Sequence, residues 1–187
     1  MSYEGASLEA YASISNLANL SVSSIDTMVQ SGNWLYPVEG VAPEGRIRDA
    51  GFDACFRQSS GGSIQFTATQ EDLGWMTRDG LGAVSPKAKF ILDALQGAKG
   101  VSFVYSRFIK SGALPLVLIL EANGYTPYGR DSPMLKNGPQ APGGRQCAKC
   151  SRKEQEHKGA GHVFKPAKYI LLTGRATLSP NNAGMVA

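Results

Sequence analysis

Two cysteines and two histidines gather in one short stretch of the chain. Cys147 and Cys150 are separated by two residues, and His157 and His162 follow with the spacing C-x2-C-x6-H-x4-H. Both histidines of the chain and two of its three cysteines fall within these 16 residues. Thiolates and imidazoles are preferred ligands of tetrahedral Zn2+, and a C-x2-C turn holds both sulfurs on one side of the backbone. The spacing therefore predicts a structural zinc site.

The distance between the two ligand pairs limits what kind of zinc module this can be. DNA-reading fingers place about a dozen residues between the pairs to form a strand and a helix, and six residues are too few. We therefore expect a small zinc knuckle. Two alternatives remain open: a redox C-x-x-C, which normally opens a helix after a strand, and four unrelated surface groups.

Basic residues surround the predicted ligands. They are Lys149, Arg152, Lys153, Lys158 and Lys165. Such cations favour thiolates, and two thiolates with neutral imidazoles would cancel the charge of the metal. The knuckle would then keep a positive face. That face suits phosphate, although simple solvation of the charges explains it equally well.

The elements on either side must position this site. Tyr125 to Gln146 is a long loop rich in proline and glycine, which we interpret as either a solvated loop or one that contacts a nucleic-acid strand. The apolar run Lys168–Thr173 follows the site and is predicted to be a strand. We expect it to pair in parallel with a second buried strand at Val101–Tyr105.

That second strand lies inside a predicted helix–strand–helix unit. Ser85 can cap the first helix, with Pro86 at its first position, and the second helix runs from about Gly112 to Asn123. This arrangement is typical of half a doubly wound α/β unit, in which ligands bind at the carboxyl ends of strands. Ser106 and Arg107 follow the strand at such an edge, where packing and solvation are the alternative explanation. The first helix is expected to bury Phe90, Ile91, Ala94 and Leu95.

The remaining segments are predicted from local patterns. Leu8 to Leu20 keeps a helical interval, and Ile25, Met28 and Val29 could begin a second helix. Gly32–Gly51 is interpreted as a loop-rich linker. Further predictions are short strands at Phe52–Phe56 and Ile64–Thr69 and a short helix at Leu73–Leu81. Cys55 has no adjacent histidine to activate it, so we expect a buried residue and not a nucleophile.

Several stretches together resemble a known family. SPKAKFILDAL, GVSFVYSRF and SGALPLVLILEANGYTPYG resemble the start of the second RecA-like lobe of superfamily 2 helicases, with Tyr105-Ser106 in the place of motif IV. The similarity is greatest to the helicase-like ATPases of poxviruses and other large DNA viruses. QSGNWLYP (Gln30–Pro37) and AKYILLTGRATLSPNNAG (Ala167–Gly184) resemble flanking segments of the same proteins. The resemblance covers most of the chain, and the order of the motifs is more specific than any one of them.

The resemblance implies a fold and a nucleic-acid site. The fold would be α/β, a partial RecA-like (P-loop NTPase-type) parallel sheet with flanking helices and a small zinc-knuckle insertion. Residues 1–45 would be a helical and linker segment, 46–125 the first part of the lobe, 126–166 the loop with the knuckle, and 167–187 the returning strand and the end. Ser106, Arg107 and the helix N-terminus at Gly112 would contact the backbone of DNA or RNA.

The groups needed for ATP hydrolysis are absent from the sequence. There is no G-x-x-x-x-G-K-[ST] loop and no Asp-Glu box for magnesium, and nothing resembles motifs V and VI. We expect no catalytic residues and no ATP hydrolysis by this chain alone. ATP and Mg2+ would belong to the complete motor, whose missing lobe or split remainder would be the partner. A free-standing zinc-stabilised interaction module is the alternative; a small-molecule α/β enzyme lacks any acid, base or nucleophile cluster.

Composition sets the remaining limits. The 187 residues are 42% hydrophobic, which allows one sizeable core, and 19 basic against 15 acidic residues give a charge of +4 with a pI near 9.0. An odd count of three cysteines favours a reducing compartment. No secretory signal is visible, and the longest apolar run, Leu114–Leu120, is too short to span a bilayer. We expect a soluble intracellular chain without membrane contact; the resemblance implies a virion or the cytoplasm of an infected cell.

Overall fold

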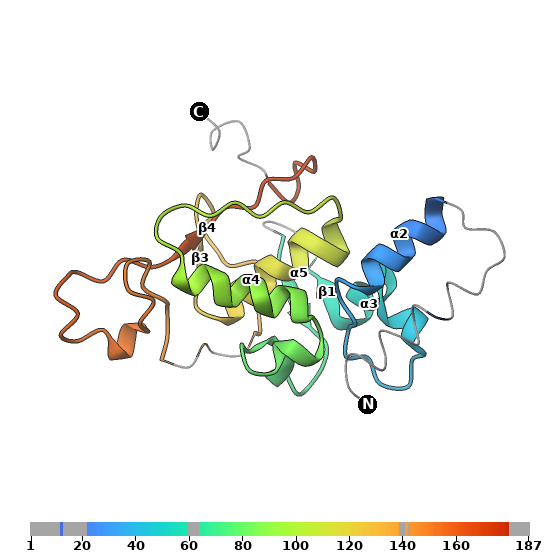
Figure 1. Ribbon diagram of the computed structural model, residues 1–187, viewed down its shortest axis with the longest axis horizontal. Helices are drawn as coiled ribbons and strands as arrows, with labels where there is room; N and C mark the ends of the chain where they lie inside the picture. Colours follow the sequence, from blue (N-terminus) through green and yellow to red (C-terminus); the bar gives the residue numbers. More distant parts are fainter. Residues whose placement is uncertain (1–11, 13–21, 60–63, 139–140, 142, 180–187) are drawn as a thin grey trace.

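The computed structural model describes residues 12, 22–59, 64–138, 141 and 143–179 (Figure 1). The predicted helix from Leu8 to Leu20 lies, apart from Ala12, outside the described residues. Every helix within the described part is too short or too polar to cross a bilayer.

An apolar helix occupies the centre of the fold. Helix α5 (Leu114–Ala122) buries eight of its nine residues, and Pro115 is accommodated because it lies in the first turn. Helix α4 (Pro86–Gly97) lies beside α5 (Figure 1). The predicted cap of α4 is confirmed: Ser85 Oγ accepts a hydrogen bond from the Ala88 amide at 3.0 Å and donates one to Asn33 O at 2.5 Å. A π-helical turn, Ile109–Ala113, leads into α5.

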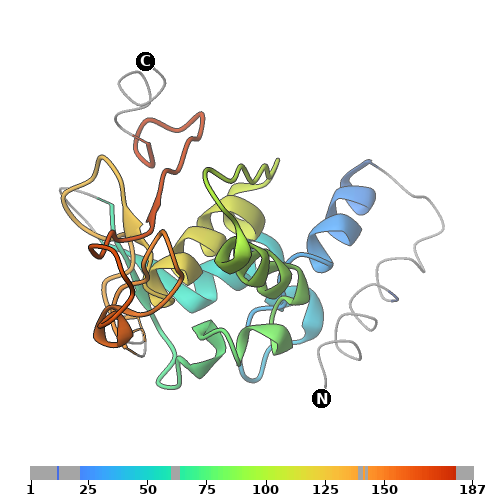
Figure 2. The same ribbon diagram turned by 60° about the vertical axis from the view of Figure 1, so that its left-hand side comes forward.

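Aromatic rings fill the space between α5 and the amino-terminal elements. Trp34 stacks on Tyr36 at 6.0 Å, and Tyr36 meets Phe52 edge to face at 6.1 Å. Phe52 in turn contacts Phe66 at 5.5 Å. Rings packed in this way stabilise a core beyond their buried area. Helix α2 (Val22–Ser31) lies at one end of the described part of the molecule (Figure 2). Its presence confirms the helix predicted to begin near Ile25.

The described strands form two small sheets. β1 (Phe56–Gln58) pairs antiparallel with β2 (Phe66–Ala68), which lies within the predicted strand at Ile64–Thr69. β3 (Thr126–Pro127) pairs in parallel with β4 (Lys168–Tyr169). Short 3-10 turns occupy Pro43–Arg46, Gly74–Met76, Leu81–Ala83 and Glu154–Glu156.

Val101–Tyr105 is not the buried strand that its sequence predicts. The segment is extended but belongs to no sheet, and Val101, Phe103 and Tyr105 are 103%, 85% and 77% exposed. The expected pairing with Lys168–Thr173 is also wrong, because β4 takes β3 as its partner. A parallel RecA-like sheet is thus not found among the described residues, and that fold class stays a prediction.

The predictions for the segment before β1 were also wrong. Helix α3 (Arg48–Cys55) occupies the end of the predicted linker and most of the predicted Phe52–Phe56 strand. The helix packs closely on its surroundings at Gly51, where a Cβ would lie 2.5 Å from Arg46 O and 2.6 Å from the Tyr36 ring. Only glycine permits that approach. The predicted helix at Leu73–Leu81 is also not formed, because the 3-10 turns Gly74–Met76 and Leu81–Ala83 take its place.

The predicted buried face of α4 is shifted. The helix buries Ala88 and Leu92 and leaves Phe90 72% exposed.

One carboxylate of α5 joins two other segments to this helix. Glu121 accepts hydrogen bonds from the amides of Met134 at 2.8 Å and Leu135 at 2.6 Å, and from the Tyr169 hydroxyl at 2.5 Å. Burial raises the pKa of Glu121, and these hydrogen bonds oppose that rise. Because Tyr169 is in β4, the carboxylate fixes the end of α5 to the strand that follows the predicted metal site.

Tyr169→Phe should lower the free energy of unfolding by about 1.5–3 kcal/mol, the usual range for a hydrogen bond to a charged group. Urea denaturation of both proteins at neutral pH measures this. Tyr128→Phe is the matched control, since Tyr128 is 53% exposed and should change stability by less than about 0.5 kcal/mol. Equal stability of Tyr169→Phe and the unmodified chain would contradict the role of the carboxylate.

Candidate metal centre

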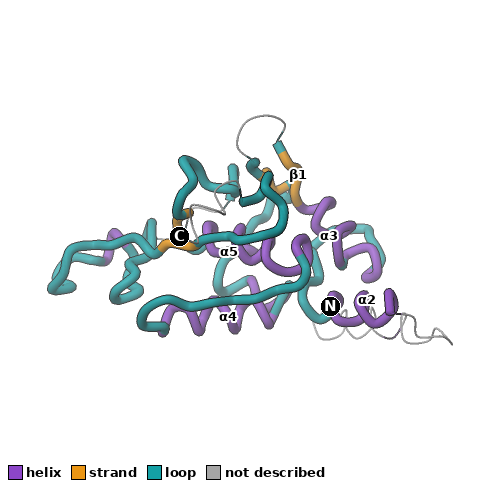
Figure 3. Tube along the Cα trace, turned by 90° about the horizontal axis from the view of Figure 1, so that it is seen from above, coloured by secondary structure: helices purple, strands orange, loops and turns teal. Residues whose placement is uncertain are grey.

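The four predicted ligands lie in a loop that projects from the helical body (Figures 1 and 3). We call residues 145–168 the metal loop. Its base is tied to the end of α5, because the Gln146 amide donates to Gly124 O at 2.8 Å and the Ala167 amide donates to Gln146 O at 2.7 Å. Gly124 has φ +93, and a Cβ there would lie 2.8 Å from Gly144 O. The glycine that ends the helix thus also lets the loop approach it.

Cys147, Cys150, His157 and His162 converge in this loop. Their ligand atoms all lie within 4.8 Å of one another. Cys147 Sγ is 3.5 Å from His162 Nε2, and His157 Nε2 is 3.2 Å from His162 Nε2. A tetrahedral zinc ion with ordinary bond lengths would separate a sulfur and a nitrogen by about 3.6 Å and two nitrogens by about 3.3 Å. The group therefore fits Zn2+ in both ligand type and spacing.

The surroundings of the ligands suit metal binding. His162 Nδ1 lies 2.9 Å from Ala160 O, and since a carbonyl only accepts, Nδ1 carries the proton and Nε2 keeps its lone pair for a metal. Burial of Cys147 raises the pKa of its thiol. Hydrogen bonds from the backbone of Lys165, Lys149 and Cys150, together with the contact to His162, outweigh burial and lower that pKa to about 5. The lowered pKa favours the thiolate, the form that binds zinc.

The backbone of the C-x2-C turn does not match the redox alternative. Ser151, directly after Cys150, has φ +58, and its amide donates to Cys147 O at 3.0 Å. The motif therefore closes a tight turn and does not open a helix, as a redox C-x-x-C normally does. The convergence of all four side chains likewise opposes the interpretation as unrelated surface groups.

The third cysteine is structural, as the sequence predicts. Cys55 is fully buried in the aromatic core. Burial raises the pKa of its thiol to about 12, against a weaker opposing hydrogen bond from Gln70. A thiol with so little thiolate is a poor nucleophile.

The predicted nucleic-acid residues lie close together in the structure, but they already contact other parts of the protein. Ser106 Oγ accepts from the Phe108 amide and donates to Phe108 O, and a Cβ on Gly112 would overlap the same oxygen. Arg107 pairs with Asp26 at 2.8 Å and lies over the Phe108 ring. Gly112 lies within the π-helical turn, not at the N-terminus of a longer helix. Their contact with nucleic acid stays a prediction.

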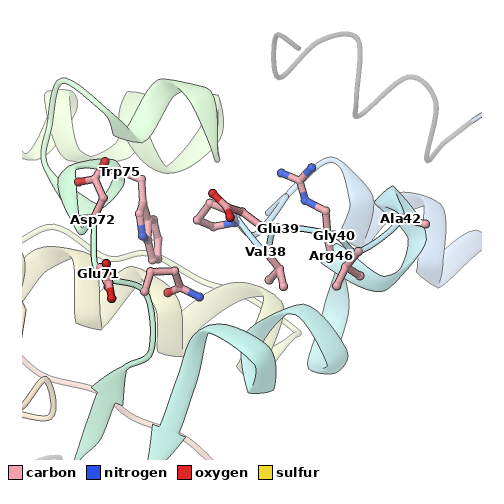
Figure 4. A pocket seen from close by; sticks show the side chains of 11 residues that line it. Val38, Glu39, Gly40, Ala42, Arg46, Glu71, Asp72 and Trp75 are labelled. Carbon is pink, nitrogen blue, oxygen red and sulfur yellow. The ribbon is translucent and has the colours of Figure 1, made fainter.

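A hollow of about 1040 Å3 lies on another part of the surface (Figure 4). Trp75 faces Glu39 across it, and Glu71 and Asp72 add two further carboxylates. Sequence reasoning did not find this hollow, because its lining residues come from two segments more than twenty positions apart. It contains none of the predicted site residues.

Comparison of the chain with protein-family models, with curated proteins and with solved structures finds no match.

The purified chain should contain about one zinc ion, held by two thiolates and two imidazoles. Cys150→Ser should weaken zinc affinity at least about tenfold, because a hydroxyl does not replace a thiolate ligand. Elemental analysis and competition with a chromogenic chelator measure both quantities. Cys55→Ala removes a cysteine outside the cluster and should leave the zinc content unchanged. Equal zinc loss in both variants would refute the site.

Removal of zinc by a chelator should loosen the metal loop and leave the body folded. Hydrogen exchange of the Gln146, Ala148 and Ala167 amides should become at least about tenfold faster, since a structural metal supplies folding free energy to its loop. The amides of α4 and α5 serve as the internal control. Unchanged exchange in the loop after complete metal removal would contradict a structural role.

Proposed function

We propose that the chain is a zinc-stabilised part of the second lobe of a superfamily 2 helicase-like motor. In this proposal it contributes nucleic-acid contacts and is completed by further polypeptide. The α/β, RecA-like character of the lobe belongs to the proposal, and so does its origin in a large DNA virus. Both rest on the resemblance of the sequence motifs.

The uncovered Val101–Tyr105 segment is the observation that carries the proposal. In the described part of the chain, no backbone hydrogen bond joins residues 101–105 to another segment. Burying a side chain such as Val101 or Phe103 is worth about 1.5–3 kcal/mol each. An extended chain with open backbone groups and exposed apolar side chains is suited to accept another strand. This supports a sheet that further polypeptide completes.

The chain is not proposed to hydrolyse ATP by itself. The sequence offers no phosphate-cradling loop and no magnesium box. Hydrolysis would need the lobe that carries them. The role proposed for this chain is therefore structural and nucleic-acid binding.

A free-standing zinc-stabilised interaction module is the second candidate. The projection of the metal loop from the body favours it, because an exposed knuckle can bind a partner without a motor (Figure 3). The two candidates differ in whether another polypeptide covers Val101–Tyr105. A motor lobe must cover this segment, whereas a free-standing module need not.

The product of the neighbouring open reading frame should cover this segment if it carries the remaining helicase motifs. Co-expression should yield a stable complex in which the amides of residues 101–105 exchange at least about tenfold more slowly than in the isolated chain. Phe103→Lys should abolish the complex, because a lysine cannot be buried in such a sheet without large cost. Val163→Lys is the matched control, since Val163 is 83% exposed in the metal loop.

Two results would overturn the motor proposal. One is a neighbouring frame without helicase motifs. The other is slow exchange of residues 101–105 in the isolated chain, which would show that the segment is already covered.

A further inference from the structure

The positive charge of the protein is concentrated in the metal loop. Residues 145–168 contain seven of the 19 basic residues and two of the 15 acidic ones, a surplus of five. The rest of the chain has 12 basic and 13 acidic residues, a deficit of one. A zinc ion with two thiolates adds no net charge to the loop. The whole surplus of the chain therefore lies on the element that projects from the body.

These charges are free to act on a partner. Lys149, Arg152, Lys158, Lys165 and Lys168 are exposed, and none of them has an ion pair within the described residues. The only ion pair of the loop in that part of the chain joins Arg145 to Glu154. Elsewhere some cations are paired: Arg107 pairs with Asp26 and Lys110 with Asp53.

Backbone hydrogen bonds hold two of the cationic residues, Arg152 and Lys165, beside the metal site. The Cys147 amide donates to Arg152 O at 2.9 Å, and the Ala148 amide donates to Lys165 O at 2.7 Å. Arg152 and Lys165 therefore lie beside Cys147 and Ala148, the two residues that precede Lys149 in the chain. Because zinc would fix the backbone of the loop, these residues would lose little further backbone freedom when they bind a polyanion.

An aromatic ring adjoins the basic surface. Tyr128 is 53% exposed, and Lys168 Nζ lies 5.4 Å from its ring centroid. A basic surface with an exposed ring is the combination that binds single-stranded nucleic acid, through phosphates and base stacking. The acidic hollow with Glu39, Glu71 and Asp72 would repel the same ligand.

We infer that the metal loop is a binding surface for single-stranded nucleic acid. Lys149, Arg152, Lys158 and Lys165 contact successive phosphates, and Tyr128 stacks on a base. This inference rests on the proposed nucleic-acid function and moves its main contact from Ser106 and Arg107 to the zinc-stabilised loop.

Fluorescence anisotropy with a labelled oligothymidine of about 20 nucleotides tests the inference on the full zinc-loaded chain, between about 50 and 200 mM NaCl. Replacing Lys149, Arg152, Lys158 and Lys165 by alanine should raise Kd at least about tenfold. It should also reduce the slope of log K against log salt by about 0.7 for each lost phosphate contact. Tyr128→Ala should raise Kd about fivefold or more at unchanged slope.

A charge-matched variant separates local contact from net charge. Replacing Arg57, Lys99, Lys136 and Arg175 by alanine removes the same number of exposed cations outside the loop and should raise Kd less than about threefold. Zinc content equal to that of the unmodified chain verifies that each variant retains the folded loop.

The remaining outcomes are decisive. No binding by the unmodified chain would remove both this inference and the nucleic-acid part of the proposed function. Equal weakening by the two fourfold variants, or loss of binding on Arg107→Ala alone, would overturn the loop assignment and leave the proposed function standing. Poly-glutamate or phosphatidylserine vesicles that compete as well as unlabelled oligothymidine would show that the surface selects no nucleic acid.

Discussion

The hydrogen bonds of Glu121 are the constraint on which the described structure depends. α5 is otherwise apolar on every side, so this carboxylate is costly to bury without partners. Its bonds to Met134, Leu135 and Tyr169 meet that cost and tie the strand after the metal loop to the end of α5. Beside it, Gly124 and Gln146 hold the start of the same loop. Both ends of the metal loop are therefore fixed to one helix terminus.

Between these fixed ends, the loop has little apolar core of its own. Its buried residues are Gln146, Cys147 and Ala167, and the half-buried ring of His157 contacts Phe164. Four metal bonds can replace a hydrophobic core in a segment of this size. This accounts for an exposed, strongly basic loop that still has a defined shape. The body needs no such help, because its connected aromatic and aliphatic side chains form one continuous cluster.

Two surfaces of the protein are thus left open for different physical reasons. Val101–Tyr105 exposes apolar side chains and backbone groups and is suited to another strand. The metal loop exposes cations and an aromatic ring and is suited to a polyanion. A polypeptide that completes a sheet and a nucleic acid that contacts the loop could bind together, because they use different chemistry on different segments. That combination is what the proposed part of a motor requires.

The sequence by itself determined what depends on near neighbours. The four residues of the candidate metal site lie within 16 residues of one another, and the Ser85 cap bonds an amide three positions away. Tertiary structure decided what depends on distant partners. Arg107 is occupied by Asp26, 81 positions away, β4 joins β3 and not Val101–Tyr105, and Gly51 packs as helix against Tyr36. Local patterns encode propensity and ligand spacing, whereas strand pairing and burial are set by which remote surfaces meet, and no local pattern contains that information.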